Sequence, residues 1–191
     1  MEIGVLALQG DFIEHYRILQ SLDVNPRLVK LPKDLENLQG LIIPGGESTT
    51  IGKLATAYEL IAPLRRFGQS QAILGTCAGA IFLSKDVARE QPLLRLMDIQ
   101  VERNAFGRQV DSFEIDLPAP FLENGESNPY HAVFIRAPII KSVSGRAEVL
   151  LSLPDGGIVA AQQGKLLATS FHPELTSDNR FHQYFLELAK S

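Results

Sequence analysis

The segment Ala72-Ile73-Leu74-Gly75-Thr76-Cys77-Ala78-Gly79 joins a short apolar run directly to the start of an apolar helix. The residues 72–74 have the continuous apolar character of a strand that is covered on both faces. The apolar residues that follow, through Leu83, predict a helix. A buried strand that leads at once into a helix is the building unit of α/β proteins, so this junction indicates the fold class.

Strand and helix patterns alternate through the first half of the chain and give way to closely spaced strands in the second half. This alternation predicts βαβ units, a mostly parallel central sheet and helices on both of its faces. In the first half, the expected elements are strands at Ile3–Leu8, Arg27–Leu31 and Gly40–Ile43, a helix from about Phe12 capped by Asp11, and a helix from about Thr49 capped by Ser48 or Thr49 and broken near Pro63. In the second half, they are strands at Val110–Leu117, Ala132–Arg136, Ala147–Leu153, Gly157–Gln163 and Leu166–Phe171, and a helix from about Ser177.

Length and composition predict one globular domain that covers residues 1–191. The net charge is −4, which argues against a nucleic-acid-binding or anionic-membrane-binding surface, because such a surface needs clustered positive charge. No apolar stretch approaches the roughly 18 residues of a transmembrane helix. The single cysteine, Cys77, rules out an intrachain disulfide and favours a reducing compartment. We therefore expect a cytoplasmic location.

Cys77 is the candidate nucleophile. It lies in the pattern Gly75-x-Cys77-x-Gly79 between a strand and a helix, which is the nucleophile-elbow arrangement with cysteine in place of serine. A sharp strand-to-helix turn exposes the side chain, and the amino terminus of the helix favours the thiolate. The N–H of Ala78 is expected to face the developing oxyanion. The alternative is a buried structural cysteine, and the flanking glycines favour the functional interpretation.

His172 is the candidate base and Glu174 its orienting carboxylate. The proline between them keeps His172 extended, and residues two apart in an extended segment point to the same side. Glu174 can then bond one imidazole nitrogen and leave the other for the thiol, as in a nucleophile–base–carboxylate triad. For His15, expected to be exposed, and for His131 and His182, a structural role is the preferred interpretation.

The residues Pro44–Thr50 follow the third expected strand and contain two adjacent glycines. Gly45 and Gly46 allow backbone conformations that other residues avoid, so an N–H from this loop could complete an oxyanion hole at the carboxyl edge of the sheet. A nucleotide-phosphate loop is the alternative. We set it aside because Lys53 is followed by Leu54 rather than by serine or threonine, and the glycine spacing does not match.

Together these segments resemble the class I, triad-type glutamine amidotransferases, and more narrowly the family of glutaminase subunits of pyridoxal 5′-phosphate synthase. The resemblance spans essentially the whole chain. It rests on GTCAG at 75–79 and on Leu6–Gly10 (LALQG), Pro44–Thr50 (PGGESTT), Arg103–Glu114 (RNAFGRQVDSFE), Phe134–Pro138 (FIRAP) and Ser170–Glu174 (SFHPE).

The resemblance implies a three-layer α/β/α, flavodoxin-like fold and a defined role for each of several site residues. It implies catalysis by Cys77, His172 and Glu174 through a cysteinyl thioester, with no cofactor and no metal. The glutamine site that it implies consists of Gly46, Glu47, Ser48, Arg103, Ile135 and Arg136, and the oxyanion hole consists of Gly46 and Ala78. An arginine suits the α-carboxylate of glutamine, and Glu47 suits its ammonium group.

The same resemblance implies a partner. Ammonia from L-glutamine would pass to a TIM-barrel synthase subunit within a large heteromeric complex that makes the vitamin B6 coenzyme. Three alternatives stay open at this point. They are a glutaminase subunit of another biosynthetic pathway, a partner-independent cysteine hydrolase of similar fold, and a regulatory module whose triad is no longer used.

Overall fold

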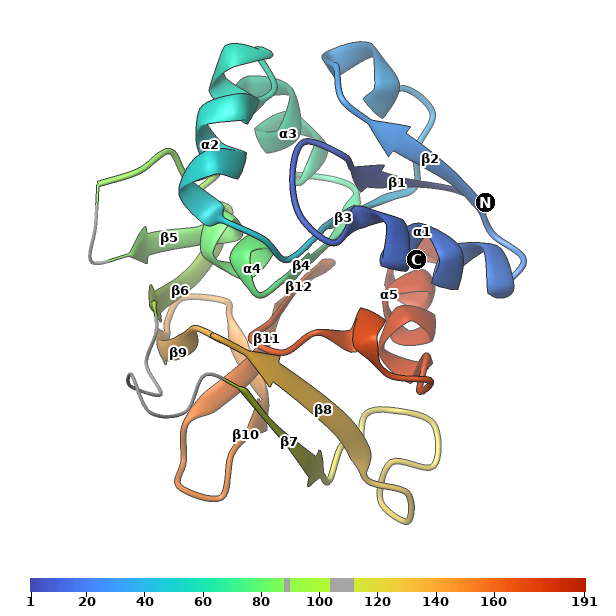
Figure 1. Ribbon diagram of the computed structural model, residues 1–191, viewed down its shortest axis with the longest axis vertical. Helices are drawn as coiled ribbons and strands as arrows, with labels where there is room; N and C mark the ends of the chain where they lie inside the picture. Colours follow the sequence, from blue (N-terminus) through green and yellow to red (C-terminus); the bar gives the residue numbers. More distant parts are fainter. Residues whose placement is uncertain (88–89, 104–111) are drawn as a thin grey trace.

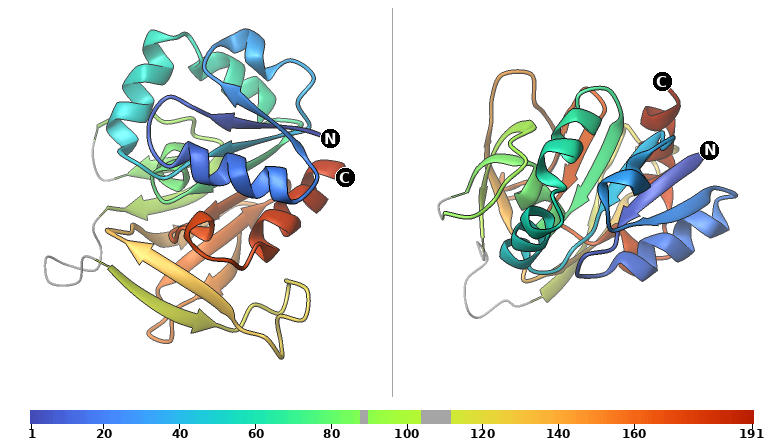
Figure 2. Two further views of the ribbon diagram at one scale, coloured as in Figure 1. Left: turned by 45° about the vertical axis from the view of Figure 1, so that its right-hand side comes forward. Right: turned by 90° about the horizontal axis from the view of Figure 1, so that it is seen from above.

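The computed structural model describes residues 1–87, 90–103 and 112–191 of the chain. Its centre is a large mixed sheet with helices on both faces, so the molecule has three layers (Figures 1 and 2). The expected α/β class is therefore confirmed. Residues 104–111, which contain most of the Arg103–Glu114 motif and the first two residues of the expected strand Val110–Leu117, lie outside the described residues.

The described elements are as follows. The strands are β1 (Glu2–Leu6), β2 (Asn25–Val29), β3 (Gly40–Ile43), β4 (Ala72–Thr76), β5 (Ser84–Val87), β6 (Met97–Glu102), β7 (Ser112–Leu117), β8 (Tyr130–Ile135), β9 (Ile139–Val143), β10 (Glu148–Ser152), β11 (Ile158–Gln163) and β12 (Leu166–Thr169). The helices are α1 (Phe12–Ser21), α2 (Ser48–Ala57), α3 (Ile61–Phe67), α4 (Ala78–Leu83) and α5 (Arg180–Lys190), with short 3₁₀ turns η1 (Pro32–Leu35) and η2 (Pro173–Leu175).

The main sheet has the strand order β2-β1-β3-β4-β12-β11-β9-β6-β5, and β10 pairs with β11. Neighbouring strands are parallel along the part of this order that comprises β2, β1, β3, β4 and β12. In contrast, β11 runs antiparallel to β12 and to β9. A separate antiparallel pair, β7–β8, lies across the lower part of the molecule in Figure 1. Because β1, β3, β4 and β12 are parallel, the loops that follow them meet at one edge of the sheet.

Two apolar cores lie on the two faces of the sheet. Strand β3 shows why, because alternate residues of a strand point to opposite faces. Leu41 and Ile43 belong to the core that also contains side chains of α2, α3 and α4, whereas Ile42 belongs to the core that contains side chains of α1 and α5. All three side chains are fully buried, as the continuous apolar pattern predicted.

Several sequence-based boundaries need correction. The break expected near Pro63 comes earlier: α2 ends at Ala57, and Pro63 lies in the first turn of the separate helix α3, where proline is tolerated. Strands β5, β6 and β9 had no counterpart in the prediction. The last helix begins at Arg180 rather than near Ser177.

The expectation that His15 is exposed is wrong. Its side chain is fully buried, because α1 packs the face that carries His15 and Leu19 against the sheet. The expected cap of the same helix is also wrong, since Asp11 precedes α1 but its side chain makes no capping hydrogen bond.

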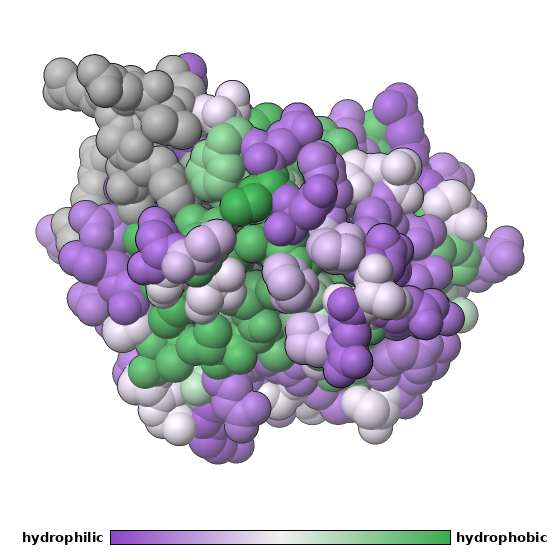
Figure 3. Space-filling model, turned by 90° about the horizontal axis from the view of Figure 1, so that it is seen from below, coloured by the Kyte–Doolittle hydropathy of each residue, from purple (hydrophilic) through white to green (hydrophobic). Residues whose placement is uncertain are grey.

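The face seen from below in Figure 3 shows apolar side chains gathered among polar ones. The strands at this lower end of the molecule include β7, β8 and β10, and the exposed apolar side chains on β8 and β10 include Ile135 and Val149. In the described ranges, no helix combines the length and the apolar character needed to cross a bilayer.

A close backbone contact between α4 and β3 generates a stability prediction. A Cβ atom on Gly79 would lie 2.0 Å from the carbonyl oxygen of Ile43, and a backbone atom cannot move aside as a side chain can. We expect Gly79→Ala to lower the free energy of unfolding by about 3 kcal/mol, the upper end of the usual cost of overpacking. Urea unfolding followed by circular dichroism measures this change.

Gly68→Ala is the matched control. Gly68 has a helical backbone, and the nearest obstacle to its new Cβ is the end of the Leu96 side chain, which can rotate. The change in unfolding free energy there should stay within about 1 kcal/mol. Equal effects of the two substitutions would contradict the close-contact argument.

Candidate active site

Cys77 occupies a strained turn between β4 and α4. Its φ of 48° and ψ of −102° are values that residues other than glycine rarely adopt. The turn is held because the Cys77 N–H donates to the carbonyl of Thr169 on the neighbouring strand β12, at 2.8 Å. The side chain is only 7% exposed, yet it lines a cavity. This is the nucleophile-elbow geometry that the flanking glycines predicted.

His172 and Glu174 follow β12 and lie side by side. His172 has a φ of −103° and a ψ of 89°, and its N–H donates to the carbonyl of Val133 at 2.8 Å. The imidazole Nδ1 lies 2.6 Å from the Glu174 carboxylate oxygen Oε1, and both side chains are buried. The pairing of these two residues is as predicted, but the expected extended segment is wrong, because Pro173 and Glu174 lie in the 3₁₀ turn η2.

Cys77 as well as Glu174 affects the pKa of His172. Burial by itself lowers the pKa of His172, but hydrogen bonds to Cys77 and to Glu174, and the charges of both groups, outweigh it and raise the pKa to about 10. Burial raises the pKa of Glu174, and the hydrogen bond and charge of His172 oppose that effect. The arrangement therefore favours a proton on His172.

Asp11 adds a second carboxylate near His172. Its Oδ2 lies 3.8 Å from Nδ1 of His172, and its side chain is 47% exposed. Ligand atoms of Asp11, His172 and Glu174 lie within 4.8 Å of one another, a spacing that a metal ion could also use. Because Nδ1 of His172 already bonds Glu174, the geometry favours an imidazole–carboxylate pair over a set of metal ligands.

The loop after β3 packs against the His172 ring and against the loop after β1. A Cβ on Gly45 would lie 2.6 Å from Cε1 of His172, so this position has no space for a side chain. Gly46 has a φ of +145°, which glycine adopts readily. The carbonyl of Gly45 accepts the N–H of Asp11 at 3.1 Å, and the side-chain oxygen of Gln9 accepts the N–H of Glu47 at 2.7 Å.

A cavity of about 410 Å³ opens beside Cys77. Most of the residues expected to bind glutamine line it, namely Gly46, Glu47, Ser48, Arg103 and Arg136, together with Cys77 and Ala78. Ile135 does not line this cavity, and its contact with substrate stays a prediction. Gln9 lines the cavity as well, and sequence reasoning did not assign Ile81 and Pro138 to it, although Pro138 lies within a quoted motif.

Glu47 and Arg103 pair with each other across the pocket wall. The guanidinium Nη2 of Arg103 lies 2.9 Å from Oε1 of Glu47. Glu47 also accepts the N–H groups of Thr49 and Thr50, so it caps α2 in place of the expected Ser48 or Thr49. Burial alone raises the pKa of Glu47, but these hydrogen bonds lower it to about 2.

Among the described residues that line the cavity, Arg136 is the other cation. It has a φ of 45°, an unusual value for a residue other than glycine, and its side chain is exposed. Among the ion pairs of the described residues, none involves Arg136. Its guanidinium is thus available to an anionic group of a ligand, whereas that of Arg103 is already engaged.

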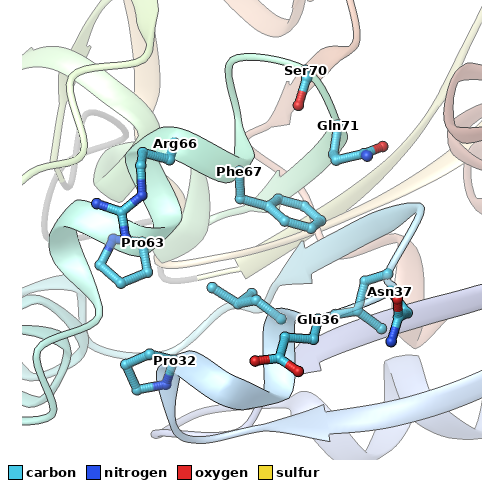
Figure 4. A pocket seen from close by; sticks show the side chains of 10 residues that line it. Pro32, Glu36, Asn37, Pro63, Arg66, Phe67, Ser70 and Gln71 are labelled. Atoms are coloured by element: carbon cyan, nitrogen blue, oxygen red, sulfur yellow. The ribbon is translucent and has the colours of Figure 1, made fainter.

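A second cavity of about 410 Å³ lies between η1 and α3 (Figure 4). Figure 4 shows Pro32, Glu36, Arg66 and Phe67 around it. The described residues that line it include no cysteine and no histidine, so it lacks the thiol and the imidazole that the expected triad needs. The cavity beside Cys77 is therefore the candidate active site.

Known proteins resemble this chain over its whole length. The model of the SNO glutamine amidotransferase family matches residues 5–191. The protein named pyridoxal 5′-phosphate synthase subunit PdxT from Herpetosiphon aurantiacus is 58% identical over 193 residues, covering 98% of this chain and 100% of that protein. The protein of the same name from Thermus thermophilus is 53% identical, covering 98% of this chain and 97% of that protein.

Solved structures also resemble this chain over nearly its whole length. A crystal structure described as a glutamine amidotransferase superposes with a TM-score of 0.92 at 51% identity, covering 99% of each chain. The structure of PurLQS from Thermotoga maritima gives a TM-score of 0.72 at 16% identity, covering 97% of each chain, and shows the common fold alone.

The environment of His172 generates a prediction about its protonation. With a pKa raised to about 10, His172 should remain protonated at pH 8, where an ordinary histidine is neutral. Cys77→Ala removes one of the hydrogen bonds that raise the value, so the pKa of His172 should fall by about one unit or more. An NMR titration of ¹⁵N-labelled histidines measures both values. A wild-type His172 that titrates near pH 6.5 would contradict the argument.

Proposed function

Because the chain belongs to the SNO glutamine amidotransferase family, we propose that it is the glutaminase subunit of pyridoxal 5′-phosphate synthase and releases ammonia from L-glutamine. The observation that carries the proposal is the elbow thiol of Cys77 beside the buried His172–Glu174 pair, at the wall of a cavity of about 410 Å³. Residues 1–191 act as one glutaminase domain in this proposal.

In the proposed reaction, the Cys77 thiolate attacks the side-chain amide carbon of glutamine. The amide oxygen becomes an oxyanion, which the N–H groups of Gly46 and Ala78 stabilise. The N–H of Ala78 has no acceptor within α4, because Ala78 begins the helix. Protonated His172 gives its proton to the leaving nitrogen, so that ammonia departs and a thioester remains. Neutral His172 then takes a proton from water, which hydrolyses the thioester to glutamate.

Charged groups in the cavity support recognition of the amino-acid end of glutamine. We assign the α-carboxylate to Arg136, because Arg103 is already paired with Glu47. We assign the ammonium group to Glu47, whose low pKa keeps it ionised. Arg103 then holds Glu47 in place, and Ser48 and Ile135 complete the proposed site.

The proposed partner is the synthase subunit, a TIM barrel that would receive the ammonia within a large heteromeric complex. The names of the relatives support this part of the proposal, since each is a subunit of pyridoxal 5′-phosphate synthase and matches nearly all of this chain. A cytoplasmic location is also proposed. The catalytic thiol must be reduced to act as a nucleophile, and a reducing compartment keeps it so.

The proposal predicts that the purified chain hydrolyses glutamine and that the cognate synthase subunit stimulates it strongly. Glutamate release, with and without that subunit, is the measurement. Cys77→Ala should abolish turnover while it retains binding to the synthase, because only the nucleophile is removed. Turnover that the synthase does not change would favour a glutaminase of another pathway, and absence of turnover with well-folded protein would favour a different cysteine hydrolase.

The assignment of Arg136 predicts a change in KM rather than in kcat. Arg136→Gln removes a charge-assisted contact to the substrate carboxylate, so the KM for glutamine should rise by about tenfold or more while kcat changes less. Steady-state kinetics in the presence of the synthase measure both. Arg66→Gln is the matched control, because Arg66 lines the other cavity. A KM that is unaltered in Arg136→Gln would contradict the assignment.

A further inference from the structure

We propose that His15 is a positioning residue for the catalytic pair, and that its Nε2–H holds the second carboxylate oxygen of Glu174. This inference rests on the proposed function. The family motifs and the triad do not require a residue from α1 at this place. The cluster that carries the inference is formed by four buried residues, His15, Glu174, Thr76 and His182.

The unsatisfied oxygen of Glu174 is the first observation. Oε1 bonds His172, but Oε2 is buried and makes no hydrogen bond within the part of the chain that the structure describes. Nε2 of His15 lies 3.3 Å from Oε2, and both side chains are completely buried. A buried carboxylate oxygen without a donor is costly, so a proton on Nε2 of His15 stabilises this arrangement.

The neighbours of His15 indicate which of its nitrogens carries the proton. Nδ1 of His15 lies 2.9 Å from Nε2 of His182, and Nδ1 of His182 has no partner among the described residues. If His182 carries its proton on Nε2, it donates to Nδ1 of His15, and the unpartnered Nδ1 of His182 is only an acceptor. The proton of His15 then lies on Nε2, the nitrogen that faces Glu174. The same Nε2 lies 3.2 Å from the hydroxyl oxygen of Thr76.

The opposite assignment leaves two buried groups unsatisfied. A proton on Nδ1 of His15 would bond His182, and Nε2 of His15 would then present a lone pair to the Glu174 carboxylate. With the proton of His15 on Nδ1, the proton of His182 would have to lie on the unpartnered Nδ1 of His182, and a buried N–H without an acceptor is unfavourable. Hydrogen-bond satisfaction therefore selects the Nε2–H form of His15.

Both histidines of the cluster are neutral. Burial lowers the pKa of His15 well below its usual value, and electrostatic interactions with His182 and His172 lower it further. Burial lowers the pKa of His182 to about 4. His15 therefore supplies a hydrogen bond and no positive charge. A neutral His15 can hold the Glu174 carboxylate in position while the negative charge of Glu174 remains available to the His172 imidazolium.

The position of His15 also links the two halves of the catalytic machinery. Thr76 directly precedes Cys77 at the end of β4, and Glu174 belongs to η2, which follows the base. His15 contacts both from α1. It thus sets the position of the carboxylate relative to the elbow while His172 changes its protonation state during the reaction.

The direct test is the tautomer of His15 in the unmodified chain. Two-dimensional ¹⁵N–¹H NMR spectra of ¹⁵N-histidine-labelled protein distinguish a protonated Nε2 from a protonated Nδ1. We expect a neutral His15 with its proton on Nε2 at pH 7, and a change in this resonance when Glu174→Gln replaces the carboxylate. A neutral His15 with its proton on Nδ1 would overturn the proposal, whatever the activity of the protein.

Kinetics of the glutaminase complex with its synthase subunit supply the second test. His15→Leu should lower kcat by about tenfold to a hundredfold, as expected when a donor to a charged group is removed, with KM changed by less than about threefold. His15→Gln places an amide N–H near the same point and should recover most of kcat. His131→Leu is the control, since His131 is partly exposed on β8 and pairs with Asp116 and Glu114.

The outcomes separate the possible failures. An unchanged kcat in His15→Leu overturns the proposal. The proposal is also overturned if His15→Leu and His15→Gln lose kcat equally and each loss of kcat parallels the loss of thermal stability of that variant. Wild-type protein without turnover contradicts the proposed function instead, and the tautomer of His15 still decides the hydrogen bond. If His15→Leu does not fold, the spectrum of the wild-type chain and the kinetics of His15→Gln remain decisive.

Discussion

The hydrogen bond from the Cys77 N–H to the Thr169 carbonyl is the interaction on which the rest of the site depends. Cys77 holds a backbone conformation that costs about 1–3 kcal/mol for a residue other than glycine, so the neighbouring structure must hold it. The bond joins β4 to β12, and β12 leads directly to His172. One contact between adjacent parallel strands therefore fixes the nucleophile relative to the base.

Parallel pairing explains why residues from four distant segments meet. The loops after β1, β3, β4 and β12 contribute Gln9, Gly46, Cys77 and His172, and all four leave the sheet at the same edge. Small residues let these loops approach closely: Gly45 leaves room for the imidazole, and Gly46 adopts a backbone that other residues avoid. The electrostatics follow from the same packing, because a buried imidazole between a thiol and a carboxylate gains a proton.

The sequence was sufficient to predict the features that depend on local pattern. The strand β3, the elbow at Cys77 and the pairing of His172 with Glu174 each follow from neighbouring residues, and the structure has all three. Features that depend on distant neighbours were missed. The burial of His15 was missed because its neighbours Glu14 and Arg17 are charged, although Phe12 and Leu19, at helical spacing from His15, place it on the apolar face of α1. The capping role of Glu47 was likewise hidden, because serine and threonine at the next positions are the more usual caps.

Because Cys77 is the single cysteine of the chain, its oxidation has a particular consequence. The chain contains no second cysteine, so an oxidised sulfur at the elbow cannot be captured as an intrachain disulfide. The sulfenic acid is reversible only through a thiol that comes from another molecule, and further oxidation to the sulfinic acid is not reversed by thiols. The cavity beside Cys77, of about 410 Å³, has more than the volume of a small peroxide. The redox state of the surroundings therefore sets how long this site stays active.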